Sequence, residues 1–169
     1  MKILLSILMV LLLGACASYS GRGLQPGVAG VDEVVRVMGQ PAMRWQNADG
    51  SSQLAYPRGS MGVQTFMVVI GTDGKLKNLE NVLSTKNFAQ IQPGMAKDQV
   101  LRLLGPSEPS WTAYYARRDE LVWEWRYCNE LNQLSRFDVL FDASKSVVRS
   151  SMGMTESQRS LCGRTECWC

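Results

Sequence analysis

Two segments of the chain share one pattern of apolar and polar positions. Residues 24–41 read LQPGVAGVDEVVRVMGQP, and residues 91–107 read IQPGMAKDQVLRLLGPS. At an offset of 66, the apolar positions 34, 37 and 38 coincide with 100, 103 and 104, the spacing of one helical face. A glycine and then a proline within two residues follow each face, which is typical of a helix end. The pattern therefore predicts short helices over residues 31–38 and 97–104.

Segments rich in β-branched and aromatic residues follow each predicted helix. FMVVIGTDGKL at 66–76 aligns with FDVLFDASKSV at 137–147 at an offset of 71, so the second copy is five residues longer in its middle. Asp73-Gly74 is favoured in two-residue hairpin turns because both residues accept positive φ, which places strands on both sides. We predict strands near 52–57, 63–71 and 75–80, near 120–127, 134–142 and 146–152, and short first strands around 44–45 and 112–115.

Two shorter segments complete the pattern. STKNFAQI, 84–91, predicts a helix with Phe88 and Ile91 on one face and Ser84 as its cap. Thr155 and Gln158 have capping-box spacing, which favours one more short helix over 154–162. The predicted fold is α+β, with two tandem units, each of one or two short helices followed by a three- to four-stranded antiparallel sheet. Because no long linker separates the units, we expect them to pack together.

The first residues have the features of an export signal. Lys2 precedes an apolar run, 3–13, that is shorter than the ~20 residues a bilayer span needs. The run closes on LGAC, 13–16, which resembles the lipobox of bacterial lipoproteins, where the cysteine is lipidated and the chain is cut before it. The resemblance implies that Cys16 is the lipidated N-terminus, and Ala17 rather than Asp after it implies the outer membrane. The alternative is an ordinary signal peptide with an incidental cysteine.

These observations divide the chain into five parts. A signal peptide, 1–15, precedes a lipidated N-terminus and glycine-containing tether, 16–30. The first repeat covers 24–82, the second covers 83–153, and a cysteine-containing tail covers 154–169. The predicted location is the periplasmic face of the outer membrane, where two or more acyl chains hold a protein more firmly than one.

Composition and cysteine usage narrow the function classes. The chain is 46% hydrophobic and 20% charged, as in globular proteins, and its net charge of +3 includes no long charge block, so nucleic acid is not an expected partner. Four cysteines follow Cys16, and in an oxidising periplasm two disulfides are expected: Cys128, Cys162, Cys167 and Cys169. A bridge across one residue is geometrically the least favourable, so Cys128 is predicted to join the tail to the body. The alternative is a four-cysteine zinc site, although CxC is not the usual spacing.

The second copy carries a recognisable family pattern. It combines a Phe-x-x-Ile-x-x-Gly-Met segment, a helix end close to Val-x-x-Leu-Leu-Gly-x-Pro and an aromatic strand, with the matching residues Phe88, Ile91, Gly94, Met95, Val100, Leu104, Gly105, Trp123, Trp125 and Tyr127. This pattern resembles the SmpA/OmlA, or BamE-like, family of outer-membrane lipoproteins. The resemblance covers residues 84–152 well and 24–80 weakly, and Ala96 stands where family members usually have Thr or Ser. The tandem arrangement is similar to the β-lactamase inhibitor proteins in architecture.

Several aromatic and acidic residues are candidates for partner binding. In LVWEWRY, 121–127, Trp123 and Trp125 lie on one face of a strand; such a face is usually core, but Trp and Tyr also dominate binding hot spots. Trp111, Tyr114 and Tyr115 lie in the longer middle segment of the second copy. Asp49, in the predicted turn NADGSS, is either turn chemistry or an acidic probe for an enzyme cleft.

The sequence favours binding over catalysis. It contains no histidine, no Gly-x-Ser-x-Gly segment and no phosphate loop, so we predict a non-enzyme without cofactor, metal or small-molecule substrate. The family resemblance implies an accessory or scaffold factor in β-barrel outer-membrane protein assembly and envelope integrity, whose protein partner is the assembly machinery. The tandem architecture leaves open a membrane-tethered inhibitor of a periplasmic or cell-wall enzyme. A third alternative is a structural lipoprotein that contacts peptidoglycan.

Overall fold

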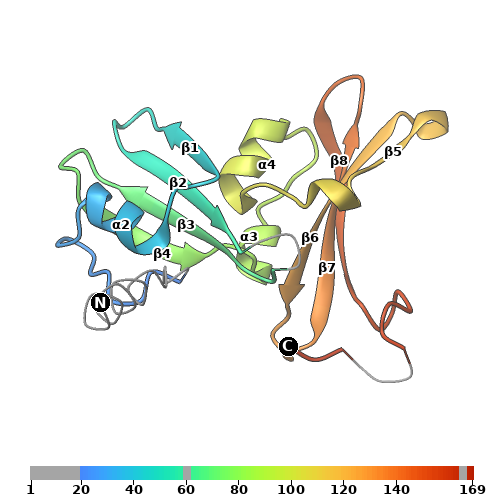
Figure 1. Cartoon of the computed structure of the whole chain (residues 1–169). Coiled ribbons are helices and arrows are strands. Elements are labelled where there is room, and N and C mark those ends of the chain that lie inside the picture. The colour runs from blue at the N-terminus through green and yellow to red at the C-terminus, as the bar shows by residue number, and fades with distance from the viewer. Residues whose placement is uncertain (1–19, 59–61, 164–166) are drawn as a thin grey trace, which may run out of the picture.

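The computed structural model describes residues 20–58, 62–163 and 167–169, so the predicted signal peptide and Cys16 lie outside it. These residues form two four-stranded antiparallel sheets and a few short helices, which confirms the predicted α+β class (Figure 1). Each sheet is a meander, in which consecutive strands are neighbours. Two sheets of identical topology, one after the other in the chain, are what the internal repeat predicts.

The first unit is one helix followed by one sheet. Helix α2 spans Val31–Met38, and strands β1 (Met43–Gln46), β2 (Ser52–Pro57), β3 (Thr65–Ile70) and β4 (Leu76–Asn81) follow in spatial order. The β3–β4 turn lies at the predicted Asp73-Gly74 pair. Of these two residues only Gly74 has positive φ, at 74°, so a longer turn from Gly71 to Lys75 joins the strands.

The second unit repeats this order with more irregular structure. Helices α3 (Thr85–Phe88) and α4 (Lys97–Leu104) precede two 3-10 turns, η2 (Pro109–Trp111) and η3 (Ala116–Arg118), which flank β5 (Ala113–Tyr115). Strands β6 (Glu120–Cys128), β7 (Leu134–Asp142) and β8 (Val147–Thr155) complete the sheet. Both predicted long helices have the predicted bounds, and each ends at a glycine of positive φ, 84° at Gly39 and 73° at Gly105.

Helix α4 lies between the two sheets and packs against both (Figure 1). Val100 and Leu104 are fully buried in the core that fills one face of the second sheet. Leu101 points the other way, into a small cluster on the first sheet. The Trp45 indole N–H donates to Asp98 Oδ1 at 3.1 Å, and Gln53 Nε2 donates to the Arg102 carbonyl at 2.6 Å. The expected packing of the two units is therefore confirmed, and α4 is the element that joins them.

Two predicted helices differ in the structure. The segment 84–91 is helical only over Thr85–Phe88, because the chain turns at 89–90 and the Gln90 and Ile91 N–H groups donate only three residues back, to Asn87 and Phe88. The predicted helix over 154–162 is wrong: β8 extends to Thr155, and turns follow it. The expected capping pair does form, since the Thr155 N–H donates to Gln158 Oε1 and the Gln158 N–H donates to Thr155 Oγ1.

The chain then reverses before a helix can propagate. Ser160 has a φ of 56°, and the Leu161 N–H donates back to the Glu156 carbonyl at 2.9 Å. Such a long return bond after a residue of positive φ is how helices end. A single turn is therefore opened and closed within the same few residues.

Two disulfides hold the C-terminal tail. Cys128 is joined to Cys169, with Cα atoms 6.0 Å apart, and Cys162 is joined to Cys167, with Cα atoms 5.7 Å apart. The first bond closes a loop between the end of β6 and the last residue, as the sequence predicts for Cys128. The tail also pairs beside the β6–β7 turn, because Leu134 N–H donates to the Cys167 carbonyl and Cys169 N–H to the Asn132 carbonyl, both at 2.9 Å.

Candidate partner-binding surfaces

The aromatic face of β6 is mainly core. Trp125 is 3% exposed, and its indole N–H is shared between the carbonyls of Gly105 and Pro106, at 3.3 and 3.1 Å. Trp123 is half-buried and lies edge-to-face with Phe141, with ring centroids 4.7 Å apart. Of these two candidates Trp125 has no surface to offer a partner, and Trp123 offers only part of one.

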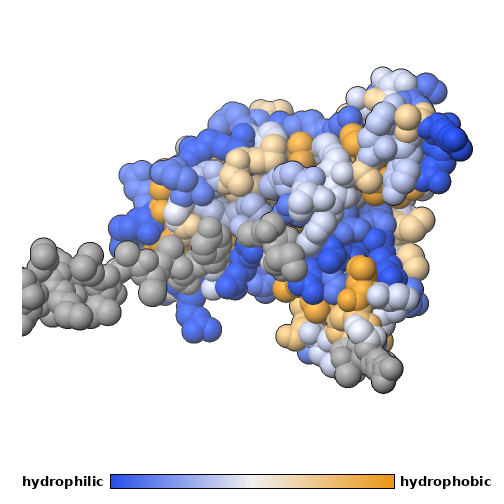
Figure 2. Space-filling view, turned by 45° about the vertical axis from the view of Figure 1, so that its right-hand side comes forward, coloured by the Kyte–Doolittle hydropathy of each residue, from blue (hydrophilic) through white to orange (hydrophobic). Residues whose placement is uncertain are grey.

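The β5–β6 hairpin carries the most exposed aromatic candidates. Tyr114 is 59% exposed and Tyr115 is 47% exposed, and the guanidinium of Arg118 lies 4.6 Å from the Tyr115 ring centroid. Arg118 also pairs with Glu120 at 2.8 Å, which holds it beside the ring. The hairpin projects from the upper right of the molecule, where residues of intermediate hydropathy (white) lie beside hydrophilic residues (blue) (Figure 2). Exposed tyrosines beside arginines match the composition of binding hot spots.

Trp111 lies apart from the two tyrosines. It is half-buried on η2, and the guanidinium carbon of Arg136 is 3.9 Å from its ring centroid. The indole therefore covers a buried charge on the outer face of the second sheet, which is the face turned away from α3 and α4. Trp111 therefore packs mainly against Arg136, although one side of its ring lines a groove between the units.

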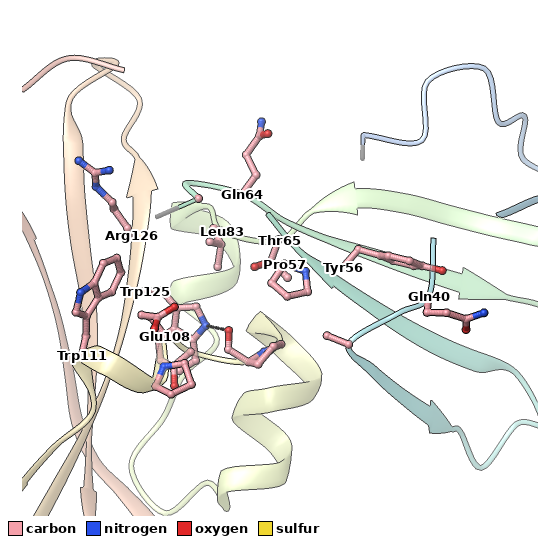
Figure 3. A pocket seen from close by; sticks show the side chains of 15 residues that line it. Gln40, Tyr56, Pro57, Gln64, Thr65, Leu83, Glu108, Trp111, Trp125 and Arg126 are labelled. Atoms are coloured by element: carbon pink, nitrogen blue, oxygen red, sulfur yellow. Dashed lines mark hydrogen bonds between the residues drawn. The ribbon is translucent and has the colours of Figure 1, made fainter. Parts of the chain in front are cut away.

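That groove has a volume of about 410 Å³. Tyr56, Pro57 and Thr65 approach from the first unit, and Trp111 and Glu108 approach from the second (Figure 3). Proline and aromatic walls with a few polar groups are typical of grooves that bind small molecules or extended peptides. The Tyr56 hydroxyl, in a residue 2% exposed, has no hydrogen-bond partner within the described parts of the chain.

Asp49 lies at the exposed tip of the β1–β2 hairpin. Its Oδ1 accepts hydrogen bonds from the Ser51 hydroxyl at 2.6 Å and the Ser51 backbone N–H at 2.9 Å. These two bonds, the hydroxyl contributing most, lower the pKa of Asp49. The carboxylate thus organises the turn, as Asp commonly does, and it stays ionised at an exposed tip. Asp49 and the Tyr114–Tyr115 pair lie on different units, so the structure does not bring the candidates into one site.

The outer face of the second sheet holds a charged network that sequence reasoning missed. Three arginines and three carboxylates alternate across it: Glu124, Arg126, Arg136, Asp138, Glu156 and Arg159. Arg136 joins Glu124 and Glu156, each at 2.6 Å, and Arg126 joins Glu156 at 2.7 Å. Arg159 pairs with Glu124 at 2.6 Å and also with Asp138. Glu156 and Arg159 belong to the tail, so the network fastens the tail to the sheet.

The environment of this network shifts the pKa values of two carboxyl groups in opposite directions. Burial raises the pKa of Asp138 to about 6, despite the attraction of the Arg159 guanidinium. Burial also acts to raise the pKa of Glu156, but the bonds donated by Arg126 and Arg136 outweigh it and the pKa is lowered. Asp138 Oδ1 accepts no hydrogen bond from any residue that the structure describes, whereas both Glu156 oxygens accept from arginine. The number of donors therefore decides the direction in which each pKa shifts.

One signal in the sequence could have located this face. Glu124 and Arg126 alternate with the tryptophans of β6, and the β6–β7 register places Glu124 opposite Asp138 and Arg126 opposite Arg136. Like-charged residues directly opposite each other repel, so each such pair requires a third residue of opposite charge. That partner comes from residues 156–159, and their position depends on the tail, which the pattern alone does not place.

Three residues of types that can bind a metal ion also lie close together in the tail. Ligand atoms of Glu156, Cys162 and Cys167 lie within 4.8 Å of one another. The two sulfur atoms are bonded to each other, however, and Glu156 is occupied by two arginines. A zinc site would need free thiolates at these cysteines. The bond between the two sulfur atoms therefore favours disulfides over the zinc alternative in the tail.

Comparison with protein-family models, with curated proteins and with solved structures gives no match. Among residues 20–58, 62–163 and 167–169, no helix has the length and apolarity that a membrane crossing requires.

Proposed function

We propose that the protein is a lipid-anchored protein of the outer membrane that acts by binding, as an accessory or scaffold factor in β-barrel outer-membrane protein assembly and envelope integrity. The N-terminal lipobox and the SmpA/OmlA-like pattern of the second copy support this role. The observation that carries the proposal is the projecting tyrosine pair of the β5–β6 hairpin, on the unit with the family pattern.

The pattern residues themselves are mainly structural. Phe88, Ile91, Val100, Leu104 and Trp125 belong to one buried cluster. A partner therefore has to recognise other residues of the same unit. Tyr114 and Tyr115 fit this requirement because both are exposed on β5, and the Arg118 guanidinium packs against the Tyr115 ring.

Crosslinking in intact cells tests the proposal. A photoreactive amino acid at Tyr114 or Tyr115 should crosslink to subunits of the barrel-assembly machinery, which are then identified in the eluate. The same group at Val28, which is 63% exposed on the first unit, is the matched control and should capture these subunits much less. Absence of assembly subunits from both tyrosine positions would contradict the proposed role.

A membrane-tethered enzyme inhibitor is the second candidate, favoured by the exposed, ionised carboxylate of Asp49 at a hairpin tip. In this role Asp49→Ala should weaken an inhibitory complex with a periplasmic or cell-wall enzyme. Asp73→Ala is a matched control, because Asp73 also organises a hairpin tip of the first sheet, accepting from the Lys75 N–H at 3.1 Å. Equal inhibition by both variants and the unaltered protein would remove the proposed contact.

A further inference from the structure

Strand β8 leaves part of the second sheet without a neighbouring strand. It is the last strand in the order β5-β6-β7-β8, and it pairs with β7 from Val147 to Thr155. A bulge at Arg149 shifts the register between Phe141 and Leu140. The residues after the bulge, Ser150–Met154, form a regular edge.

The alternation of the backbone shows which groups point away from the sheet. The Glu156 N–H donates to the Leu134 carbonyl at the start of β7, whereas the Thr155 N–H donates to the Gln158 side chain. Successive residues of a strand point their backbone groups to opposite sides. Ser151 and Gly153 therefore share the direction of Thr155, so their N–H and C=O groups face outward. No hydrogen bond joins these four groups to any described residue.

Both ends of this edge are closed by the chain itself. Before it, the Gly94 N–H donates to the Val148 carbonyl and the Val148 N–H donates to the Met95 carbonyl, both at 2.8 Å. After it, the turn that follows Thr155 occupies the Thr155 N–H and carbonyl. The open edge is thus a slot about five residues long, and each residue spans about 3.3 Å along the strand.

The other three sheet edges are protected in ways that this slot is not. Strand β5 has three residues and runs into a turn with Arg117 and Arg118. Strand β1 carries an exposed Arg44, and β4 carries exposed Lys77 and Glu80. Charges and short length are how proteins prevent unwanted strand addition. Residues 150–154, SSMGM, contain no charge and no proline.

The side chains beside the slot are apolar on one face and small on the other. Met152 and Met154 are 46% and 36% exposed on the outer face of the sheet. On the opposite face Gly153 carries no side chain, and a Cβ there would lie 3.1 Å from the Tyr127 hydroxyl. Methionine adapts its shape to different apolar side chains, so this border tolerates variation in a bound segment.

We propose that Ser150–Met154 binds an extended peptide segment of a partner protein, which adds a fifth strand to the second sheet. The ligand is a segment of about five residues without charge, with apolar side chains on alternate positions beside Met152 and Met154. The backbone groups of Ser151 and Gly153 provide the hydrogen bonds. This inference does not rest on the role in barrel assembly.

A second copy of the chain is a poor occupant. In an antiparallel pair of β8 strands, the loop at 94–96 of each copy would meet the turn after Thr155 of the other, because both obstructions lie in the plane of the added strand. A short segment that leaves the slot at both ends avoids them.

Hydrogen exchange of the full chain in detergent micelles tests the proposal. The probe is the blocked heptapeptide Thr-Val-Thr-Val-Thr-Val-Thr at millimolar concentration, and its control is the same peptide N-methylated at every residue, which has no backbone N–H to donate from either edge. Exchange at the amides of Ser151 and Gly153 should slow at least about fivefold with the first peptide only. Unchanged exchange at both amides would overturn the proposal, and so would protection that rises with protein concentration without peptide, which indicates self-association.

Two variants separate strand addition from general stickiness. Ser151→Pro removes one outward N–H, a change that edge strands tolerate, and should weaken peptide binding about tenfold with little change in the unfolding midpoint. Met152→Lys places a charge beside the slot and should weaken binding as well, whereas Val28→Lys, at an apolar residue 63% exposed on the first unit, should not. Equal peptide affinity of Ser151→Pro and the unaltered protein would contradict strand addition.

Discussion

The two sheets have the same strand order but cover their faces differently. One face of the first sheet packs against α2 through buried residues such as Leu54 and Val68, and the other packs against Leu101 of α4. The second sheet has one apolar face, against α3 and α4, and its outer face is covered by a network of six charged residues, two of which belong to the tail. Two sheets with the same strand order can therefore cover their second face in different ways, one with a second apolar layer and the other with ion pairs to a tail.

This difference is visible in the strands. Strand β3 reads TFMVVI and is buried at every position but one, as expected where both faces are covered. Strand β6 reads ELVWEWRYC and alternates between aromatic and charged residues after its first three. The charged positions of β6 are tolerated because the tail supplies Glu156 and Arg159. The second sheet thus depends on its tail in a way that the first does not.

The largest expected effect comes from α4, because it belongs to both units. Leu104→Ala should lower the free energy of unfolding by about 2–5 kcal/mol, since Leu104 is fully buried. Leu54→Ala, at an equally buried residue of the first sheet, is the matched comparison and should have a similar effect. Urea denaturation followed by tryptophan fluorescence should show one transition that both variants shift. Two steps, each sensitive to only one variant, would mean that the units unfold independently.

A smaller effect is expected from the charged network. Glu156→Gln leaves Arg126 and Arg136 with less compensating charge in a buried place, and should cost about 3 kcal/mol of unfolding free energy. Glu33→Gln breaks an exposed pair with Arg36, whose N–O distance is 3.5 Å, and should change stability by less than about 0.5 kcal/mol. Thermal and urea unfolding measure both. Similar losses in the two variants would show that the outer face is not a buried layer.

The smallest effect is a dependence on pH that belongs to Asp138. Its pKa is raised to about 6, so the folded state takes up a proton at a pH where the unfolded state does not. On acidification from pH 7 to pH 5 the unaltered protein should gain about 0.5 kcal/mol relative to Asp138→Asn, an estimate reduced for solvent screening. Urea titrations of both proteins at the two pH values measure the difference. A loss of stability of the unaltered protein relative to Asp138→Asn on acidification would contradict the raised pKa.

Much of the fold could be predicted from local patterns. The i, i+3, i+4 faces and the following glycines located α2 and α4 with their bounds, because helix periodicity and helix ends depend on nearby residues. The strands followed from alternation and turn residues for the same reason. The tail was predicted wrongly because Thr155 and Gln158 do form their local capping pair, while pairing with β7 and the return bond from Leu161 decide the conformation.

The candidate surfaces required the tertiary structure. Tyr114 and Trp125 look alike in sequence as aromatic residues of strands, yet one is 59% exposed and the other 3%, because β6 lies under the helices and β5 does not. The charged network joins residues up to 35 positions apart, and the open edge of β8 exists because nothing pairs beyond it in space. Local patterns along the chain were enough to predict the repeat, most of the helices and strands, and the link between Cys128 and the tail. Which faces of the sheets are covered follows from contacts between distant segments, and no local pattern encodes these contacts.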